Sequence, residues 1–196
     1  MDKEIQPTDE QLVAKAKAGD KEAFVVLFKR HKNRIYSYLS RYLADDEKAQ
    51  DLTLETFMNV YNHLKDYEEE GRFLPWVYRI ATNCAKKEFR KRKLADVSLD
   101  QPSAEGSDES IGDMIADEMQ RPDHTAMRGE IREIIEKALL KLSEKYRHAL
   151  LLCDVEGFTH EEAAGILNTN AKTVGTHVLR ARKILYKFLL KLKDEF

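Results

Sequence analysis

Residues 159–178 read THEEAAGILNTNAKTVGTHV, and this stretch is the strongest local signal in the sequence. Thr159 and Glu162 have the spacing of a capping box, in which two side chains bond each other's backbone amides at a helix start. Asn168 stands where a tight turn needs a left-handed residue, a conformation that asparagine tolerates better than most. Asn170 can cap the second helix. Two short helices joined in this way are typical of a DNA-binding helix-turn-helix, and the alternative is a capped, basic helical hairpin.

A helical wheel of the residues that follow places apolar and polar side chains on opposite faces. At about 100° per residue, an apolar seam lies within about 40° of Val174, and its other members are Val178, Ala181, Leu185, Phe188 and Leu192. The opposite face carries Lys172, Thr176, Leu179 and Lys183. Leu179 among polar residues fits contact with a thymine methyl group. Arg180 and Arg182 flank this face, where phosphate contacts are expected.

Helical periodicity extends over most of the remaining chain, and strand-like alternation persists nowhere in the sequence. Apolar residues recur at three- and four-residue steps from Phe24 to Tyr42, and a short helix after Thr8 is separated from this one by Gly19 and Asp20. Further helices are expected over 51–64, 75–93, 131–142, 146–155, 160–167 and 171–192. The sequence therefore predicts an all-α protein with two small helical domains, over residues 8–95 and 128–196.

The charge of the chain is distributed unevenly, although the total is only −2. Residues 96–127 contain one basic and nine acidic residues, two of the four prolines and two of the eight glycines. Such a composition cannot bury enough apolar surface to offset chain entropy, so we expect an acidic, mostly disordered linker between the domains. The alternative is an ordinary spacer whose charge has no role.

A second basic helix is predicted in the N-terminal domain, over the sequence PWVYRIATNCAKKEFRKRK at 75–93. Its packing face comprises Val77, Tyr78, Ala81, Cys84, Ala85 and Phe89. The opposite stripe carries Arg79, Asn83, Lys86, Arg90 and Lys93. Several cations on one face would bind DNA phosphates with strong salt dependence, and asparagine can pair with an adenine edge. The alternative for such a stripe is a solvated helix face.

Aromatic residues precede and begin this helix. Tyr67, Phe73 and Trp76 lie close to Gly71 and Arg72 in the sequence. Aromatic side chains beside a flexible basic loop suit stacking on unpaired bases. Core packing is the alternative role for these side chains, for Trp76 above all.

Several classes of function receive no support from the sequence. The glycine patterns of nucleotide-binding loops are missing, and Ala164 stands where a zinc protease would need a second histidine after His160 and Glu161. Cys84 and Cys153 lie far apart within apolar helical patterns, which excludes a disulfide framework and favours a reducing compartment. No apolar run is long enough for a membrane span or a signal peptide. We expect a soluble cytoplasmic protein without membrane insertion, catalytic site, metal site or cofactor.

Taken together, the motifs of both ends are similar to those of a known family. EAFVVLFKRH at 22–31, DLTLETF at 51–57, PWVYRIATN at 75–83 and FRKRK at 89–93 precede the acidic gap. LSEKYRHALLLCDVEGFTHEEAAGIL at 142–167 and RARKIL at 180–185 follow it. This order resembles the sigma-70 family, and more specifically the extracytoplasmic-function (ECF) sigma factors, which keep only sigma regions 2 and 4. The resemblance implies a transcription initiation factor that joins bacterial core RNA polymerase, recognises promoters and opens them.

The resemblance also assigns roles to particular residues. The helix that docks on the polymerase would carry Asp51, Leu52, Leu54, Glu55 and Phe57. The residues that would bind the melted −10 element of the promoter are Tyr67, Arg72, Phe73, Trp76, Arg79, Asn83, Lys86, Lys87 and Arg90. The duplex −35 element would meet Lys172, Thr173, Gly175, Thr176, Leu179, Arg180 and Arg182.

Four positions depart from the family pattern. His177 replaces a common arginine and lies towards the apolar flank of the wheel, so we expect it to pack rather than to read a base. Leu54 stands where the family usually has glutamine, which leaves an apolar rather than a polar contact with the polymerase. Lys87 replaces a common aspartate and adds charge to the −10 face. Gly175 replaces a common arginine or lysine, which removes a base-reading side chain and costs about 1 kcal/mol of helix stability relative to alanine.

Simple geometry supports binding at two DNA sites. The thirty-two residues 96–127 could span about 100 Å when extended, at roughly 3.3 Å each, whereas elements two helical turns apart are on the order of 70 Å distant. The resemblance further suggests that the acidic linker follows the RNA-exit path of the polymerase, and that an anti-sigma factor is a common partner.

Two other classes of protein remain as alternatives. Residues 173–178 also look like the helix-turn-helix of LuxR-type regulators, which bind operators without a polymerase. The N-terminal block lacks a phospho-acceptor strand pattern that such a regulator would carry. A pure interaction module is disfavoured by the basic stripes.

Overall fold

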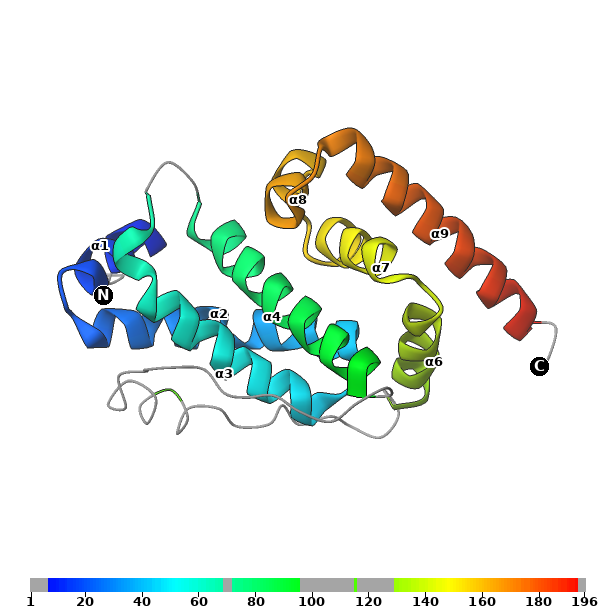
Figure 1. Cartoon of the computed structure of the whole chain (residues 1–196), viewed down its shortest axis with the longest axis horizontal. Coiled ribbons are helices and arrows are strands. Elements are labelled where there is room, and N and C mark those ends of the chain that lie inside the picture. Colours follow the sequence, from blue (N-terminus) through cyan, green and yellow to red (C-terminus); the bar gives the residue numbers. More distant parts are fainter. Residues whose placement is uncertain (1–6, 69–71, 96–114, 116–128, 194–196) are drawn as a thin grey trace, which may run out of the picture. The chain divides into compact units, whose positions relative to one another are not determined.

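A computed structural model of the chain describes residues 7–68, 72–95, 115 and 129–193, and all regular structure in these residues is helical (Figure 1). The N-terminal helices are α1 (Asp9–Lys17), α2 (Lys21–Leu43), α3 (Asp46–Asn62), the 3₁₀ turn η1 (Leu64–Asp66) and α4 (Phe73–Ala95). The C-terminal ones are α6 (Gly129–Leu140), α7 (Glu144–Leu150), the π-helix η3 (Leu151–Val155), α8 (His160–Leu167) and α9 (Ala171–Lys193). The predicted all-α class is confirmed. Of the predicted linker, 96–127, only Ile115 is among the described residues.

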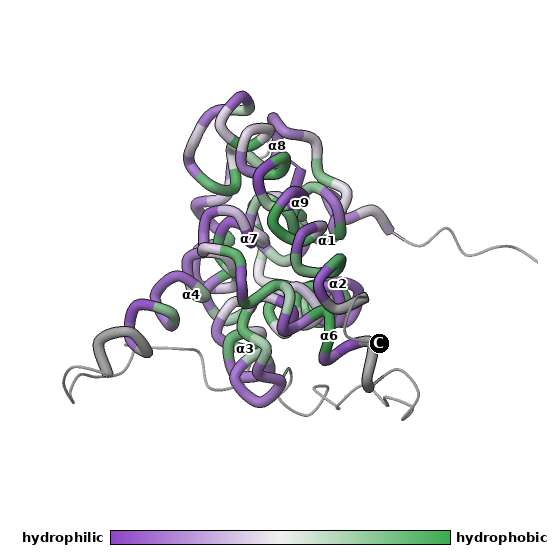
Figure 2. The backbone as a smooth tube through the Cα atoms, turned by 90° about the vertical axis from the view of Figure 1, so that its right-hand side faces the viewer, coloured by the Kyte–Doolittle hydropathy of each residue, from purple (hydrophilic) through white to green (hydrophobic). Residues whose placement is uncertain are grey.

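The chain divides into two compact units. One lies within Met1–Tyr36 and Gln50–Gln120, and the other within Ser37–Ala49 and Arg121–Phe196. Along the helices the backbone changes repeatedly between polar and apolar residues (Figure 2), as expected for amphipathic helices that bury one face.

The first unit is built around aromatic side chains from α2, α3 and α4. Phe28 and Phe57 meet edge to face with ring centroids 4.9 Å apart, and both are fully buried. The short helix α1 follows Thr8 as predicted, and the Thr8 side chain caps it by accepting a hydrogen bond from the Gln11 amide. Asp9 then fastens α1 to α2, because its carboxylate lies 2.6 Å from Arg30 and 2.8 Å from His31.

The second unit is organised by a buried arginine. Arg147 on α7 is 3% exposed. Its guanidinium donates to the carbonyl oxygens of Leu139 at 2.9 Å, Leu142 at 3.1 Å and Tyr42 at 2.7 Å. Since carbonyls at a helix end have no partner within their own helix, this side chain satisfies groups that burial would otherwise leave unpaired. Beside it, the Tyr38 hydroxyl and His148 Nδ1 are 2.7 Å apart, and His148 is buried at 1% exposure, so it is a packing residue.

Several helix boundaries differ from the predicted ones. Helices α4 and α6 each begin two residues earlier than expected, and two further differences have a visible cause. The helix expected to begin at residue 51 begins at Asp46, because the Asp45 carboxylate accepts a hydrogen bond from the Lys48 amide at 3.0 Å and caps it. The helix expected over 146–155 becomes α7 and then the π-helix η3, where the Glu156 amide reaches back five residues to the Leu151 carbonyl at 2.9 Å. The helices predicted over 160–167 and 171–192 are observed as α8 and α9.

Candidate nucleic-acid interface

The predicted helix-turn-helix is present as α8 and α9, two consecutive helices joined by a tight turn (Figure 1). The Thr159 amide donates to Glu162 Oε2 at 2.9 Å, and the Glu162 amide donates to Thr159 Oγ1 at 3.2 Å, which completes the capping box. Asn168 has φ 54° and ψ 57°, the left-handed conformation expected at this turn. Asn170 Oδ1 accepts from the Thr173 amide at 2.8 Å and caps α9. These local predictions are confirmed.

The two faces of α9 are also as predicted in its first three turns. Val174, Val178 and Ala181 are buried at 0%, 3% and 0% exposure, against α7 and α8. Leu179 is 69% exposed although it is apolar. The polar members of the same outer face, Lys172, Thr176 and Lys183, are exposed as well. The start of α9 therefore presents a mixed polar and apolar surface with the groups that major-groove recognition uses.

Gly175 brings no side chain to this surface, and its backbone lies beside a histidine from the preceding helix. A β-carbon at position 175 would lie 3.4 Å from the Nδ1 and Cε1 atoms of His160, at the start of α8. Gly175 and Thr173 are half-buried, whereas His160 is exposed. The sequence pattern does not mark His160 as part of this surface, because Gly175, its neighbour in space, is fifteen residues away in the chain.

The two arginines that flank the recognition face have different surroundings. Arg182 makes a two-pronged ion pair with Asp154, with Nη2 and Nε at 2.6 and 2.8 Å from the carboxylate oxygens. Arg180 instead donates from Nη1 to the hydroxyl of Tyr146 at 3.2 Å. The ion pair fastens α9 to η3 and offsets the charge of Arg182, so Arg180 presents more of its charge to a phosphate than Arg182 does.

Residue His177 packs rather than pointing outwards, as its place on the wheel indicated. Its ring meets that of Tyr146 edge to face, with centroids 5.3 Å apart. Desolvation lowers the pKa of His177, and the nearby cations Lys145 and Arg180 lower it further. A neutral imidazole at neutral pH suits this packing position.

In the first unit, α4 carries the predicted basic stripe. Most of its predicted packing face is buried, with Val77, Tyr78, Ala81 and Ala85 at 0% exposure and Cys84 at 7%, whereas Phe89 is half-buried. The opposite side exposes Arg79, Asn83, Lys87 and Arg90, and Lys86 is half-buried. Described side chains on α4 end at Lys91, so Lys93 lies outside them. The stripe is a surface on which DNA phosphates can be bound without displacing any core residue.

The aromatic residues before α4 form a cluster. Tyr67 and Phe73 are 8% and 2% exposed, so core packing describes both side chains. Trp76 is half-buried, with its ring centroid 4.7 Å from that of Tyr67. Arg72 is exposed, and residues 69–71, including Gly71, lie outside the described residues. Of the three aromatic rings, Trp76 offers the most surface to a base.

The residues expected to contact a polymerase lie on more than one side of α3. Asp51 is exposed, and Leu54 and Glu55 are half-buried. Leu52 and Phe57 belong to the core, at 4% and 0% exposure. The residues of this set that reach the surface are therefore Asp51, Leu54 and Glu55. Leu52 and Phe57 anchor the same helix in the core.

The described part of the chain has neither of two other kinds of feature, a membrane-spanning helix or a cluster of metal ligands. No described helix combines the length and the apolar character that crossing a bilayer requires. Among the same residues, no three histidine, cysteine, aspartate or glutamate side chains gather as metal ligands would.

Comparison with known proteins gives consistent matches in sequence and in fold. Residues 27–94 match the family model for sigma-70 region 2, and residues 132–185 match that for sigma-70 region 4. The chain is 31% identical over 192 residues to the RNA polymerase sigma-H factor of Pseudomonas aeruginosa, covering 97% of this chain and 98% of that protein. It is 29% identical over 180 residues to the ECF RNA polymerase sigma-E factor of Escherichia coli K12, covering 92% and 93% of the two chains.

Solved structures share the fold at lower sequence identity. CnrH, solved with the cytosolic domain of CnrY, is 23% identical with a TM-score of 0.69, over 92% of this chain and 96% of that one. The sigma factor RpoE of Bartonella quintana, solved with the anti-sigma factor NepR, is 22% identical with a TM-score of 0.61, over 83% and 93%.

Proposed function

This chain belongs to the sigma-70 family, among its extracytoplasmic-function members, and we propose that it directs bacterial core RNA polymerase to promoters by contacting both promoter elements and opening the −10 element. The observation that carries the proposal is that one chain has two helices whose polar and basic outer faces suit DNA. Within one unit α9 presents an exposed recognition face over a buried seam, and within the other α4 presents a basic stripe over a buried face.

The C-terminal unit would read the −35 element as duplex. In helix-turn-helix proteins the start of the second helix enters the major groove, where its side chains reach base edges. Lys172, Thr173, Thr176 and Leu179 occupy that part of α9, with Gly175 between them. Arg180 would contact the DNA backbone, and Arg182 would add to that contact while it orients α9 through Asp154.

The N-terminal unit would hold the −10 element as it opens. Arg79, Lys86, Lys87 and Arg90 would bind phosphates along α4, and Asn83 can pair with an adenine edge. Arg72 and Trp76 would meet an unpaired base, with Tyr67 and Phe73 supporting Trp76 from the core. Asp51, Leu54 and Glu55 on α3 would dock on the polymerase.

We assign region 2 to residues 8–95 and region 4 to residues 128–196, with 96–127 as the acidic linker. We further propose that the chain acts in the cytoplasm as a binding subunit without catalysis of its own. An anti-sigma factor is a proposed partner, since the similar RpoE of Bartonella quintana was solved with one.

Reconstituted transcription tests this function. Purified chain is mixed with core polymerase and a promoter library, and transcripts are mapped with and without the chain. We expect start sites that depend on the chain, and a more than 10-fold loss for Arg79→Ala/Arg90→Ala or for Lys172→Ala/Arg180→Ala. Lys15→Ala, which removes an exposed cation on α1, is the matched control. Tight operator binding by the chain alone, with unchanged polymerase output, would instead establish the LuxR-like regulator.

A further inference from the structure

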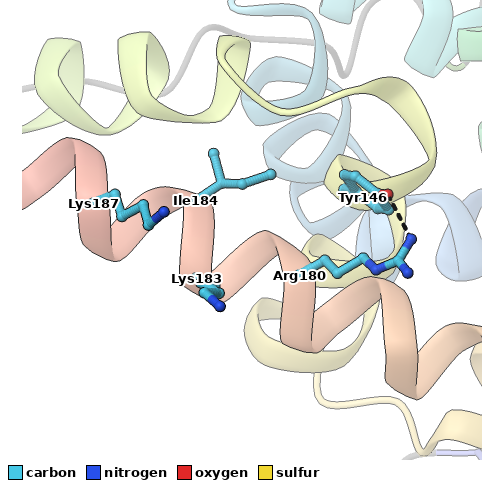
Figure 3. Close-up of a pocket in the computed structure, with 5 residues that line it drawn as sticks. All are labelled: Tyr146, Arg180, Lys183, Ile184 and Lys187. Atoms are coloured by element: carbon cyan, nitrogen blue, oxygen red, sulfur yellow. Dashed lines mark hydrogen bonds between the residues drawn. The ribbon is translucent and has the colours of Figure 1, made fainter.

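A cationic hollow lies on the second unit, and it includes Lys183, the last residue of the outer face of α9 described above. It has a volume of about 340 Å³ and is lined by Tyr146, Arg180, Lys183, Ile184 and Lys187 (Figure 3). Three of these five residues are basic, and none is acidic. Tyr146 comes from α7, and the other four residues come from α9.

The cations of the hollow form a row along one side of α9. Arg180, Lys183 and Lys187 follow each other at intervals of three and four residues, so they share a face and extend over about 10 Å of helix axis. The ammonium of Lys145 lies 5.2 Å from the centre of the Tyr146 ring and adds a further cation at the same edge.

Tyr146 connects this row to the rest of the unit. Its hydroxyl accepts a hydrogen bond from Arg180 at 3.2 Å, and that bond lowers the pKa of the phenol. On the other side its ring packs against His177. The tyrosine therefore holds the Arg180 guanidinium over the hollow, while the hydroxyl proton is left to donate to an anion.

The charge of Arg182, on the same helix, is by contrast neutralised by a carboxylate. Its guanidinium is held by both oxygens of Asp154, whereas the residues that line the hollow include no carboxylate. Like charges placed this close repel one another, and an anion would relieve that repulsion. A row about 10 Å long suits an extended polyanion better than one small ion.

We propose that this hollow binds backbone phosphates of duplex DNA beside the −35 element, with Lys183 and Lys187 as phosphate contacts and Tyr146 as the residue that positions Arg180. The proposal rests on the proposed function, because it needs α9 to lie in the major groove. It extends the DNA contact from the first turns of α9 to its middle and to α7.

The salt dependence of promoter binding tests the proposal. Holoenzyme made from the full chain and core polymerase is titrated with promoter duplex at several salt concentrations. Each lost phosphate contact lowers the slope of log K against log salt by about 0.9, so Lys183→Gln/Lys187→Gln should lower it by about 1.8. Referred to 1 M salt, that slope corresponds to roughly 20-fold weaker binding at 0.2 M. The loss should be equal for promoter and shuffled sequences.

Two further variants separate charge from shape. Lys137→Gln/Lys141→Gln removes the same charge from exposed positions of the same unit and should leave the slope unchanged. Tyr146→Phe removes only the hydroxyl, and should weaken binding by roughly 2- to 10-fold without changing the slope. Circular dichroism of each variant checks that the helices are intact.

Each other outcome would overturn the proposal in an identifiable way. An unchanged slope for Lys183→Gln/Lys187→Gln, with wild-type initiation intact, refutes the phosphate contact and leaves the proposed function standing. Weaker assembly with core polymerase at an unchanged slope would make the hollow a protein-binding site. Saturable binding of inorganic phosphate to the chain, with DNA affinity unaffected, would make it a small-anion site. A wild-type chain that starts no transcription would refute the proposed function itself.

Discussion

Replacing Arg147 with methionine should destabilise the second unit strongly. The guanidinium makes two short hydrogen bonds, to Tyr42 O at 2.7 Å and to Leu139 O at 2.9 Å, and longer ones to Leu142 O and Leu140 O. Methionine fills similar space but donates nothing, so buried carbonyls would lose their partner.

The magnitude follows from the two short bonds. An orphaned buried acceptor costs about 1–3 kcal/mol, which gives about 2–6 kcal/mol for the pair. Removing the buried charge offsets part of this loss of stability, because burial opposes the charged form of Arg147 and lowers its pKa. We expect a net loss of about 2–4 kcal/mol, and a smaller one for Arg147→Lys, whose ammonium has fewer donors.

Urea denaturation of the full chain measures this effect. Far-UV circular dichroism follows all helices, while the fluorescence of Trp76, the single tryptophan, follows the first unit. The dichroism transition of Arg147→Met should move to lower urea, with a smaller shift in the fluorescence transition. Lys141→Met, at an exposed position, should change stability by less than about 0.5 kcal/mol. A loss below about 1 kcal/mol for Arg147→Met would refute the reasoning.

Three further perturbations have definite expected outcomes. Gly175→Ala should raise the free energy of unfolding by about 1 kcal/mol, because alanine favours a helix more than glycine does. The new β-carbon would lie 3.4 Å from His160, which is an ordinary contact distance. A thermal melt with no gain in stability would contradict this. Asn168→Ala should lower it by about 1 kcal/mol because Asn168 has φ 54°, whereas Asn168→Gly should not, and equal effects of the two changes would argue against backbone strain. Burial lowers the pKa of His31 in the folded state below its ordinary value of 6.5, despite the attraction of Asp9. Neutral His31 therefore contributes fully to folding stability above about pH 6.5, and this stability is lost as the pH falls through the lowered pKa of the folded state. Stability of His31→Gln should therefore fall less between pH 7 and pH 5 than that of the wild type, and parallel pH profiles would exclude His31 as the cause.

Features that depend on neighbours in sequence were predictable here, and those that depend on distant partners were not. The capping box of Thr159 and Glu162, the turn at Asn168 and the seam through Val174 and Val178 are set by residues within about one helical turn to two turns of each other. Each of these signals could be read directly from residue types and spacing.

The buried role of Arg147 depends on Tyr42, 105 residues away, and no local pattern contains that information. The Asp154 partner of Arg182 is 28 residues away, so the wheel gave its direction but not its ion pair. The start of α3 was missed for another reason, because Asp45 is a readable cap that periodicity alone passes over.

The absence of a side chain at Gly175 has a consequence for how well such a subunit can discriminate between DNA sequences. Position 175 has no side chain with which to read a base, and each base pair left unread relaxes discrimination by about 1–3 kcal/mol. A −35 logo for this protein should therefore contain a degenerate column. The set of genomic start sites would then be narrowed mainly by the −10 sequence and by the spacing between the two elements.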